Sequence, residues 1–407
     1  MNSLLQALQR INWDFSDYNS SKYPLDINSI PWYPATFIPP IPKFLTALFT
    51  QPGDVILDPF GGKGTTTVET IKLGRFPIYN DINPFAVEIT RAIVLVIKKR
   101  LQNQVFLDNE NDLVENYKVD PNISERIIHE FNINRDIFKW YEEATLNDLL
   151  CIVDLMYKKK AENEEAFLIR KFALSSILKP ASSQHGHFTY VTDNCKPTEL
   201  IRKEAKKMYI DRINQILHAA DDLIRQFKIT NPNDNLQTII DKSLIHAGDA
   251  RKLDWIKDNS VNLVITSPPY LCAQDYIKTM RLTNLFFPNN DFNEKPRDEI
   301  GPRSKRSSNS KIVVEQFYSD MNLVFSEIER VLADGGYFCF IFGQGKTKIT
   351  SSYDTISDLH RDIIEKYSFA KIYQTERKIS NRAIQVGGVD KETILIFQKK
   401  DGGKQNA

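Results

Sequence analysis

Short apolar runs and helical repeats alternate over the first hundred residues of the chain. The run DVILD (54–58) has the length and β-branched content of a buried strand, and FPIYND (76–81) is of the same kind. Apolar residues three and four positions apart predict a helix after each strand, over 66–73 and 86–99. Strands that alternate with helices usually build a parallel sheet covered on both faces, so the pattern predicts an α/β fold.

The alternation stops at about residue 101, and the pattern stays mostly helical to about residue 240, most clearly over 147–159, 164–178 and 208–227. Strand and helix signals then alternate again to the end of the chain. Strands are expected at 243–249, 261–270, 337–343 and near 370–376 and 393–398, and helices at about 314–332 and 354–367.

This organisation predicts one doubly wound, mostly parallel sheet of the Rossmann-like kind, with a large helical insertion. The first part of the core is expected over 1–100, the insertion over 101–240, and the second part over 241–400. Residues 1–50 are expected to be irregular, except for an apolar helical stretch at 43–49. The insertion is also a candidate region for recognising a partner.

Composition narrows the class of protein. The 407 residues include 53 Lys and Arg against 52 Asp and Glu, which leaves a net charge of +1. This balance argues against a protein that coats nucleic acid by bulk charge, but it leaves room for a local basic groove. There is no apolar run of membrane-spanning length and no secretory pattern at the start. Four scattered cysteines favour a reduced, cytoplasmic protein.

A glycine-rich turn follows the first predicted strand. Asp58 ends the strand, and Phe60, Gly62 and Gly64 follow as F-x-G-x-G before the next helix. Glycines let the backbone approach a ligand closely, and a helix N-terminus offers free N–H groups, so a nucleoside-containing cofactor suits this place. A phosphate-binding P-loop does not fit, because Lys63 precedes Gly64. The alternative is a tight turn that binds nothing.

Two further acids lie at the ends of the next strands. Asp81 ends the second strand, where its carboxylate can accept both hydrogen bonds of a ribose diol, and Ile82 beside it can cover a face of adenine. Asp249 ends the third strand and can accept from an exocyclic amine. Either acid alone is as well explained as a helix cap. Three carboxylates at successive strand ends beside a glycine turn favour a site.

The most specific segment is Thr266-Ser267-Pro268-Pro269-Tyr270, after an apolar strand. The two prolines have no N–H donor and a fixed φ, which holds the carbonyls of Ser267 and Pro268 as rigid acceptors for an amino group. Tyr270 offers a ring on which an extruded base can stack. The alternative is a rigid turn that ends a strand.

Together these segments resemble the S-adenosylmethionine-dependent amino-methyltransferases of DNA, particularly the N4-cytosine enzymes of restriction–modification systems. DPFGGKGTT (58–66) resembles their cofactor motif and TSPPY (266–270) their catalytic motif. The stretches 32–60 and 331–343 also match. Two features depart from the family: many N4-cytosine enzymes carry the catalytic motif first, and the helical insertion lies outside the shared core.

The resemblance implies S-adenosylmethionine as the cofactor and a role for each matching residue. Asp58 is implied near the methionine part, Asp81 on the ribose, Ile82 on the adenine ring and Asp249 on the adenine amine. The cofactor is further implied to contact Thr36, Phe37, Phe60, Gly62 and Gly64. The flipped target base is implied to lie against Ser267, Pro268, Pro269 and Tyr270.

Two segments compete as the region that reads DNA. Residues 295–311 hold six basic against two acidic residues, and Arg303, Lys305 and Arg306 are the candidates for phosphate contacts. The other is the insertion with its polar, aromatic loop at 182–199. The loop includes His185, His187 and Cys195, but no fourth ligand lies at zinc-like spacing, so no metal is expected. Either segment can also be purely structural.

The resulting hypothesis is an enzyme that methylates cytosine N4 in duplex DNA after flipping the base, as the protective half of a restriction–modification system. A cognate endonuclease and a monomeric or dimeric state are compatible with it. The alternatives are an N6-adenine DNA methyltransferase, an RNA amino-methyltransferase, and a non-catalytic DNA-binding subunit.

Overall fold

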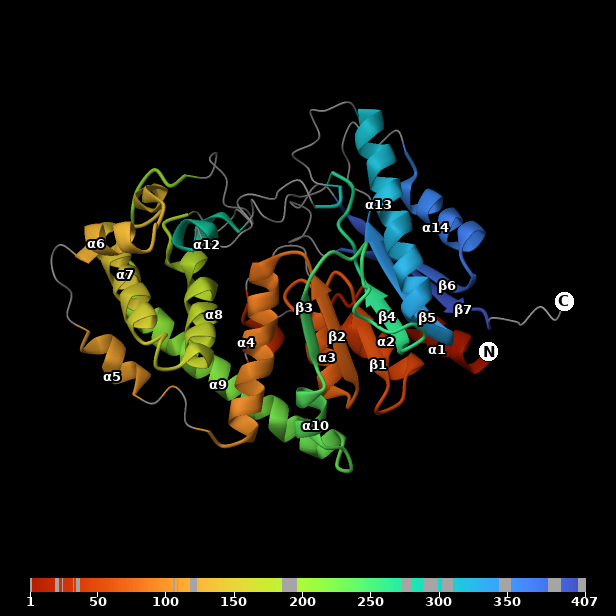
Figure 1. Ribbon diagram of the computed structural model, residues 1–407, viewed down its shortest axis with the longest axis horizontal. Coiled ribbons are helices and arrows are strands. Elements are labelled where there is room, and N and C mark those ends of the chain that lie inside the picture. The colour runs from red at the N-terminus through yellow and green to blue at the C-terminus, as the bar shows by residue number, and fades with distance from the viewer. Residues whose placement is uncertain are drawn as a thin grey trace.

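One seven-stranded sheet forms the centre of the described structure, a computed structural model (Figure 1). The strand order is β3-β2-β1-β4-β5-β7-β6; β1 to β5 pair in parallel, and β7 is antiparallel to β5 and β6. The predicted doubly wound, mostly parallel fold is confirmed. The strands are β1 (Val55–Asp58), β2 (Phe76–Asp81), β3 (Leu244–Ala247), β4 (Val261–Thr266), β5 (Leu332–Gly343), β6 (Phe369–Lys378) and β7 (Lys391–Lys399). The structure describes residues 2–18, 22–23, 25–31, 33, 37–104, 107, 109–117, 123–184, 196–272, 280–287, 299–301, 310–343, 353–379 and 389–401.

Helices cover both faces of this sheet. Successive residues of a strand point to opposite faces, and apolar residues on each face pack against helices. Leu263 and Ile265 of β4 pack with Leu45 of α2, whereas Val264 between them packs with Phe325 of α13. α1 and α2 therefore lie on one face, and α13 and α14 on the other. The helices around the sheet are α1 (Asn2–Arg10), the 3₁₀ turn η2 (Ile27–Ser29), α2 (Pro40–Phe49), α3 (Thr65–Lys72), α4 (Pro84–Leu101), α12 (Arg281–Phe286), α13 (Ser310–Val331) and α14 (Thr355–Lys366).

Between α4 and β3 the described chain is helical and lies beyond the β3 edge of the sheet (Figure 1). The long helix α9 packs on both α4 and α8, which joins this segment to the sheet. A buried ion pair fixes it internally: Arg170 contacts Glu110 at 2.8 Å, and the Tyr209 hydroxyl donates to the same carboxylate at 3.0 Å. The elements are α5 (Glu110–Glu115), α6 (Ile123–Glu130), η3 (Arg135–Lys139), α7 (Glu143–Lys158), α8 (Glu164–Ala181), α9 (Ala205–Thr230) and α10 (Leu236–Asp241).

The strand order opens a crevice at one edge of the sheet. From β1, the chain adds β2 and β3 on one side and β4 and β5 on the other, so the order reverses between β1 and β4. In open α/β sheets the loops diverge at such a point, and ligands bind outside the carboxyl ends of the strands. The carboxyl ends of β1, β2, β3 and β4 carry the motifs singled out in the sequence.

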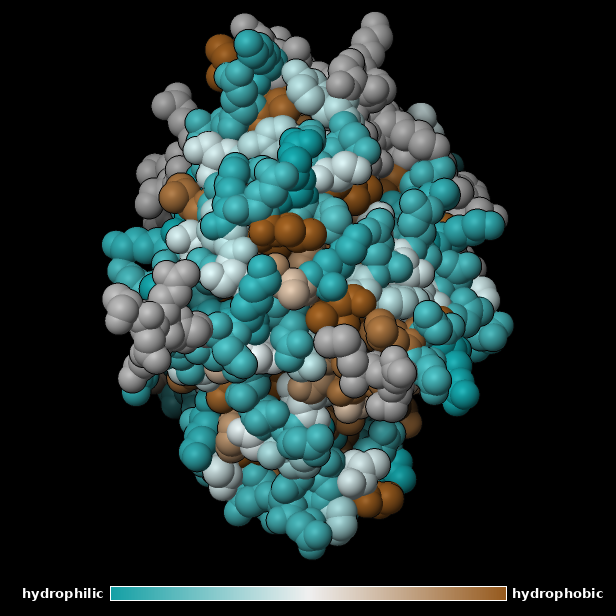
Figure 2. All heavy atoms as spheres, turned by 90° about the vertical axis from the view of Figure 1, so that its right-hand side faces the viewer, coloured by the Kyte–Doolittle hydropathy of each residue, from teal (hydrophilic) through white to brown (hydrophobic). Residues whose placement is uncertain are grey.

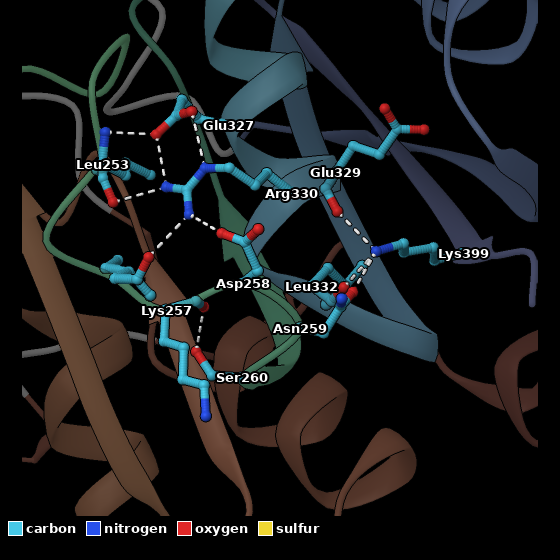
Figure 3. Close-up of polar contacts among 11 residues, drawn as sticks. Leu253, Lys257, Asp258, Asn259, Ser260, Glu327, Glu329, Arg330, Leu332 and Lys399 are labelled. Carbon is cyan, nitrogen blue, oxygen red and sulfur yellow. Dashed lines mark hydrogen bonds and ion pairs between the residues drawn. The ribbon is translucent and has the colours of Figure 1, made fainter. Parts of the chain in front are cut away.

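Polar contacts fasten α13 at the opposite, amino end of β4 (Figure 3). Arg330 of α13 donates to the carbonyls of Leu253 and Ile256, each at 2.8 Å, in the connection that leads to β4. Lys399 at the end of β7 donates to the Leu332 carbonyl at 2.6 Å, just after the helix ends. These contacts hold the layer of α13 against the sheet without using residues of the crevice.

Two predictions about secondary structure are wrong. Residues 1–50 were expected to be irregular outside 43–49, yet α1 is a helix whose Leu8 is fully buried. So short a helix depends on tertiary packing, here against β6, which local pattern does not reveal. The strand expected from residue 337 begins at Leu332 instead, because Leu332 pairs with Val261; Gly335, with φ of 74°, lies within β5 rather than before it.

The described residues include neither a membrane-spanning helix nor a cluster of metal-binding side chains. No helix among the described residues is long and apolar enough to cross a bilayer. Hydrophilic residues cover most of the described part of the face in Figure 2, with small hydrophobic patches between them. The same part of the chain holds no group of three His, Cys, Asp or Glu placed to bind a metal ion. His185, His187 and Cys195 lie outside the described residues.

Candidate functional site

A cavity opens at the carboxyl ends of the four neighbouring strands β3, β2, β1 and β4. The space between its walls, with the open solvent at its mouth included, is about 660 Å³. Every one of the four strand ends contributes to it. Its described lining consists of Tyr33, Pro59, Phe60, Gly62, Asp81, Ile82, Asn83, Asp249, Ala250, Ser267, Pro269, Glu299 and Ile300.

The predicted site residues therefore divide into two groups. Those that line the cavity are Phe60, Gly62, Asp81, Ile82, Asp249, Ser267 and Pro269. Those that are described but lie outside its lining are Phe37, Asp58, Gly64, Pro268 and Tyr270. Thr36, Arg303, Lys305 and Arg306 lie outside the described residues.

The glycine turn after β1 wraps around the carboxylate of Asp81. Gly62 and Gly64 have φ of 51° and 83°, a left-handed conformation that glycine adopts without steric cost. The Gly62 N–H donates to one Asp81 oxygen at 2.8 Å, and the Asn83 N–H donates to the other at 2.7 Å. Burial raises the pKa of Asp81 to about 6, so the carboxylate is mostly ionised at neutral pH. Its fixed oxygens line the cavity as acceptors.

Asn80, next to Asp81, ties two loops of the cavity together. Its fully buried amide donates to the Pro59 carbonyl at 3.2 Å and to the Gly248 carbonyl at 2.9 Å. Its oxygen lies 3.1 Å from Nδ1 of His246. A Cβ on Gly248 would lie 2.7 Å from His246, so the loop after β3 can pass this close only as glycine. Asn80 is not among the residues predicted from the sequence, although it stands at a strand end beside a predicted ligand.

Asp58 lies beneath the cavity rather than in its wall. The carboxylate is buried and accepts from the hydroxyl of Thr66 at 2.6 Å and from that of Thr266 at 2.9 Å. The Phe60 N–H also donates to it at 3.1 Å. Burial raises the pKa of Asp58 to about 6 despite these hydrogen bonds. Through Thr266, Asp58 joins the glycine turn to the strand that carries the Ser-Pro-Pro-Tyr segment.

Asp249 lines the cavity but already has a cationic partner. It follows β3 by two residues, and Arg251 Nε lies 2.9 Å from its oxygens. Arg251 also contacts Asp320 of α13 at 2.8 Å. An ionised carboxylate offers about four lone-pair sites, so Asp249 can still accept from a bound amine. Arg251 fixes the orientation in which it does so.

The Ser-Pro-Pro-Tyr segment presents two residues to the cavity and two to the protein. Ser267 and Pro269 line the cavity, whereas Pro268 is buried. The Tyr270 ring packs edge-on against Phe342 with centroids 5.0 Å apart. Its hydroxyl lies 3.0 Å from Ser267 Oγ and donates to Glu392 at 2.8 Å. The segment thus combines a serine that lines the cavity with a tyrosine ring that packs behind it.

The proline-rich stretch before β1 reaches the cavity through Tyr33. The Tyr33 hydroxyl accepts from the Asn83 amide at 3.1 Å, and a Cβ on Gly62 would lie 3.4 Å from the Tyr33 ring. Phe37, the residue implied by resemblance, packs instead against the core cluster around α1 and α2. No periodic signal in this stretch distinguishes Tyr33 from its neighbours.

Two residues of the basic segment 295–311 also line the cavity. They are Glu299 and Ile300, an acid and an apolar residue, rather than its cations. Lys63 of the glycine turn does not line it: the ammonium donates to the Asn28 carbonyl at 2.8 Å, and burial lowers the pKa of Lys63 to about 8. The described cavity thus carries acidic and apolar groups, which suit a ligand with hydroxyls, amino groups and an aromatic ring.

Comparisons with known proteins relate the chain to methyltransferases. Type II methyltransferase M.BsoBI of Geobacillus stearothermophilus is 25% identical over 69% of this chain and 57% of its own length. M.MjaII of Methanocaldococcus jannaschii is 21% identical over 92% of this chain and 81% of that protein. A solved S-adenosylmethionine-dependent methyltransferase of Methanosarcina mazei, 10% identical, covers 88% of this chain and 97% of its own with a TM-score of 0.33. That score carries no weight of its own.

The assignment rests on a family model. The model for N6 and N4 methyltransferases, described as DNA methylase, matches residues 6–92 and 261–406. The matched parts include the glycine turn, Asp81 and the Ser-Pro-Pro-Tyr segment, and they leave out the helices α5 to α10 and also β3 with Asp249. S-adenosylmethionine is the cofactor expected of such a protein. The match covers more than half of the sequence, and the chain belongs to the DNA methylase family.

Proposed function

We propose that the chain transfers a methyl group from S-adenosylmethionine to the N4 amino group of cytosine in duplex DNA. One observation carries the proposal: Ser267 and Pro269 line the same cavity as Gly62, Asp81 and Asp249. The reacting group and the cofactor can then meet in one place. The relatives are named Type II methyltransferases, which supports a site-specific enzyme that protects cytoplasmic DNA in a restriction–modification system.

The residues present suit S-adenosylmethionine. Asp81, held by two backbone N–H groups, would accept from the ribose hydroxyls, and Phe60 and Ile82 would flank the adenine ring. Asp249 would accept from the adenine amine. Gly62 leaves room beside Tyr33 because it has no Cβ. When bound, the cofactor supplies an electrophilic methyl carbon.

The chain's own contribution is orientation and hydrogen bonding to the target amine. Ser267 Oγ and the carbonyls of Ser267 and Pro268 would accept its N–H groups, and these acceptors favour positive charge on the nitrogen as it attacks. Tyr270, braced by Phe342, would stack on the base once it has left the duplex. No covalent bond between protein and base is required.

The preference for cytosine rests on resemblance. A serine at the first position of the catalytic motif is more usual in the cytosine enzymes, and the matching family model covers both N6 and N4 chemistry. For DNA contacts, Arg303, Lys305 and Arg306 of 295–311 and the helical segment 101–240 are alternative proposals. Phosphate contacts by the basic residues would make DNA affinity fall steeply with salt.

The proposal is tested by identifying the methylated nucleoside. Purified protein is incubated with unmethylated DNA, or with RNA, and labelled S-adenosylmethionine; the nucleic acid is digested to nucleosides and analysed by mass. We expect N4-methylcytosine from DNA, and no transfer by folded Ser267→Ala or Tyr270→Ala chains. N6-methyladenine would overturn the base assignment, and a methylated RNA nucleoside the substrate. No transfer and no cofactor binding would instead identify a non-catalytic subunit.

A further inference from the structure

Three positions lie in line across the end of the sheet, behind the Ser-Pro-Pro-Tyr segment. Gly343 of β5 pairs with Glu392 of β7, and Glu392 pairs with Arg377 of β6. Directly opposite residues in antiparallel strands point to the same face. Glu392 and Arg377 form an ion pair, with side-chain exposures of only 15% and 8%. Arg377 Nε also donates to the Trp13 carbonyl at 3.1 Å, after α1.

Tyr270 fills the place that a side chain at Gly343 would take. A Cβ on Gly343 would lie 2.7 Å from Cε2 of the Tyr270 ring, closer than non-bonded carbons approach. The missing side chain lets the ring reach the next residue in the line, and the Tyr270 hydroxyl lies 2.8 Å from Glu392 Oε1. The line therefore runs from Arg377 through Glu392 to Tyr270, and from Tyr270 to Ser267 at 3.0 Å.

The chemistry of these groups fixes the direction of each hydrogen bond. Arginine has only donors and an ionised carboxylate only acceptors, so Glu392 must receive the single phenolic proton of Tyr270. Tyr270 then has no proton left for Ser267, and the serine hydroxyl must donate to the phenol oxygen. Its proton is then engaged by Tyr270, which does not line the cavity, whereas Ser267 does; the hydroxyl of Ser267 keeps only acceptor lone pairs for a ligand.

We propose that Glu392, held by Arg377, is a positioning residue that acts through Tyr270 to keep Ser267 an acceptor toward the target amine. The proposal rests on the proposed methyl transfer. An amino group that gains positive charge needs acceptors around it and is opposed by a donor. A serine that is free to turn its proton into the cavity would act there as a donor and would no longer be a fixed acceptor for the amino group.

The substitution Glu392→Gln reverses the direction of the hydrogen bonds along this line, with almost no change in the shape of the side chain. Because Arg377 only donates, the amide oxygen of glutamine must face it, and the amide N–H then donates to Tyr270. The phenolic proton turns to Ser267, whose own proton is released toward the cavity. We expect kcat to fall by about tenfold or more, with the KM for S-adenosylmethionine unchanged.

A second variant separates this effect from a structural one. Tyr270→Phe keeps the ring and removes the hydroxyl, so it breaks the line and should lower kcat on its own. In that background Glu392→Gln should have no further effect on kcat. The proposal would be overturned if Glu392→Gln lowered kcat by the same factor with and without Tyr270→Phe. It would also be overturned if Tyr270→Phe alone left kcat unchanged. Tyr270→Phe also serves as the test if the Glu392→Gln chain does not fold.

The same hairpin provides a matched control. Glu376 of β6 contacts Lys391 of β7 at 3.0 Å, with both side chains more than half exposed. Glu376→Gln makes the same chemical change on these strands and should leave kcat unchanged; a fall equal to that of Glu392→Gln would overturn the proposal. If the unsubstituted chain did not methylate DNA, the proposed function would be contradicted. Full activity of Glu392→Gln beside an active parent would contradict only the role of Glu392.

Discussion

Gly61 is the residue of the glycine turn after β1 for which the structure shows the sharpest steric demand. A Cβ there would lie 2.3 Å from Cδ2 and Cε2 of Tyr79. Tyr79 is fully buried in β2, between β1 and β3, and its hydroxyl donates to the Gly62 carbonyl at 2.7 Å. The φ of Gly61 is outside the left-handed region, so alanine would be acceptable to the backbone itself. Gly61→Ala therefore isolates crowding.

The expected loss of stability can be worked from these contacts. Inserting a methyl group into a packed interior costs about 1–3 kcal/mol. Moving the Tyr79 ring aside also loses its hydrogen bond to Gly62, which contributes about 0.5–1.5 kcal/mol. The free energy of unfolding should therefore fall by about 1.5–4.5 kcal/mol. Because Gly62 binds Asp81, the displaced turn should also weaken cofactor binding.

Urea denaturation and calorimetric titration with S-adenosylmethionine measure the two effects. Gly53→Ala is the control for crowding, because a Cβ at Gly53 meets no atom within 4 Å. The φ of Gly53 is 88°, so this substitution should lower the free energy of unfolding by about 1–2 kcal/mol through backbone strain alone. In a Tyr79→Leu background, which removes the ring atoms, Gly61→Ala should cost less than about 1 kcal/mol. A cost that is the same with and without the Tyr79 ring would refute the steric argument.

Two further changes act on buried charges. Burial raises the pKa of Asp58 from 3.8 to about 6, so the folded chain holds the proton more tightly, and stability should fall by about 3 kcal/mol as pH rises from about 3 to about 7. Asp58→Asn should remove that part of the pH dependence in urea denaturation, and parallel curves for the two chains would contradict it. Glu110→Ala leaves the buried Arg170 without its carboxylate and should lower the free energy of unfolding by about 3–5 kcal/mol; a loss below about 1 kcal/mol would show that water solvates Arg170.

The sequence indicated where the site lies because its chemistry follows strand ends. Asp81, Asp249 and Ser267 come just after apolar runs, and parallel strands bring their carboxyl ends to one edge of the sheet. Burial distinguishes residues that hold the same position in the sequence pattern. Asp58 has the same strand-end position as Asp81, yet two threonine hydroxyls enclose it beneath the cavity. Local sequence does not show which of two acids will be covered.

The residues that the sequence did not indicate act over long separations. Glu392 meets Tyr270 only because β7 turns back beside β5, 122 residues further along the chain. Tyr33 meets Asn83 through a loop without periodicity, 50 residues earlier. A lone glutamate in a strand and a tyrosine among prolines have no local signature of function. Their roles depend on strand order and register, which spacing alone leaves open.

Strand register also explains how the core can carry so large a helical segment without disturbing the cavity. The chain leaves the sheet after Asp81 and returns at Leu244, where β3 pairs with β2 so that Ala247 lies opposite Asp81. The Gly248 N–H donates to the Asp81 carbonyl at 3.0 Å, which places Asp249 beside the cavity. Longer connections cost only slowly increasing closure entropy. The geometry of the site is therefore set by pairing between strands, and the connecting segment is free to differ from that of its relatives.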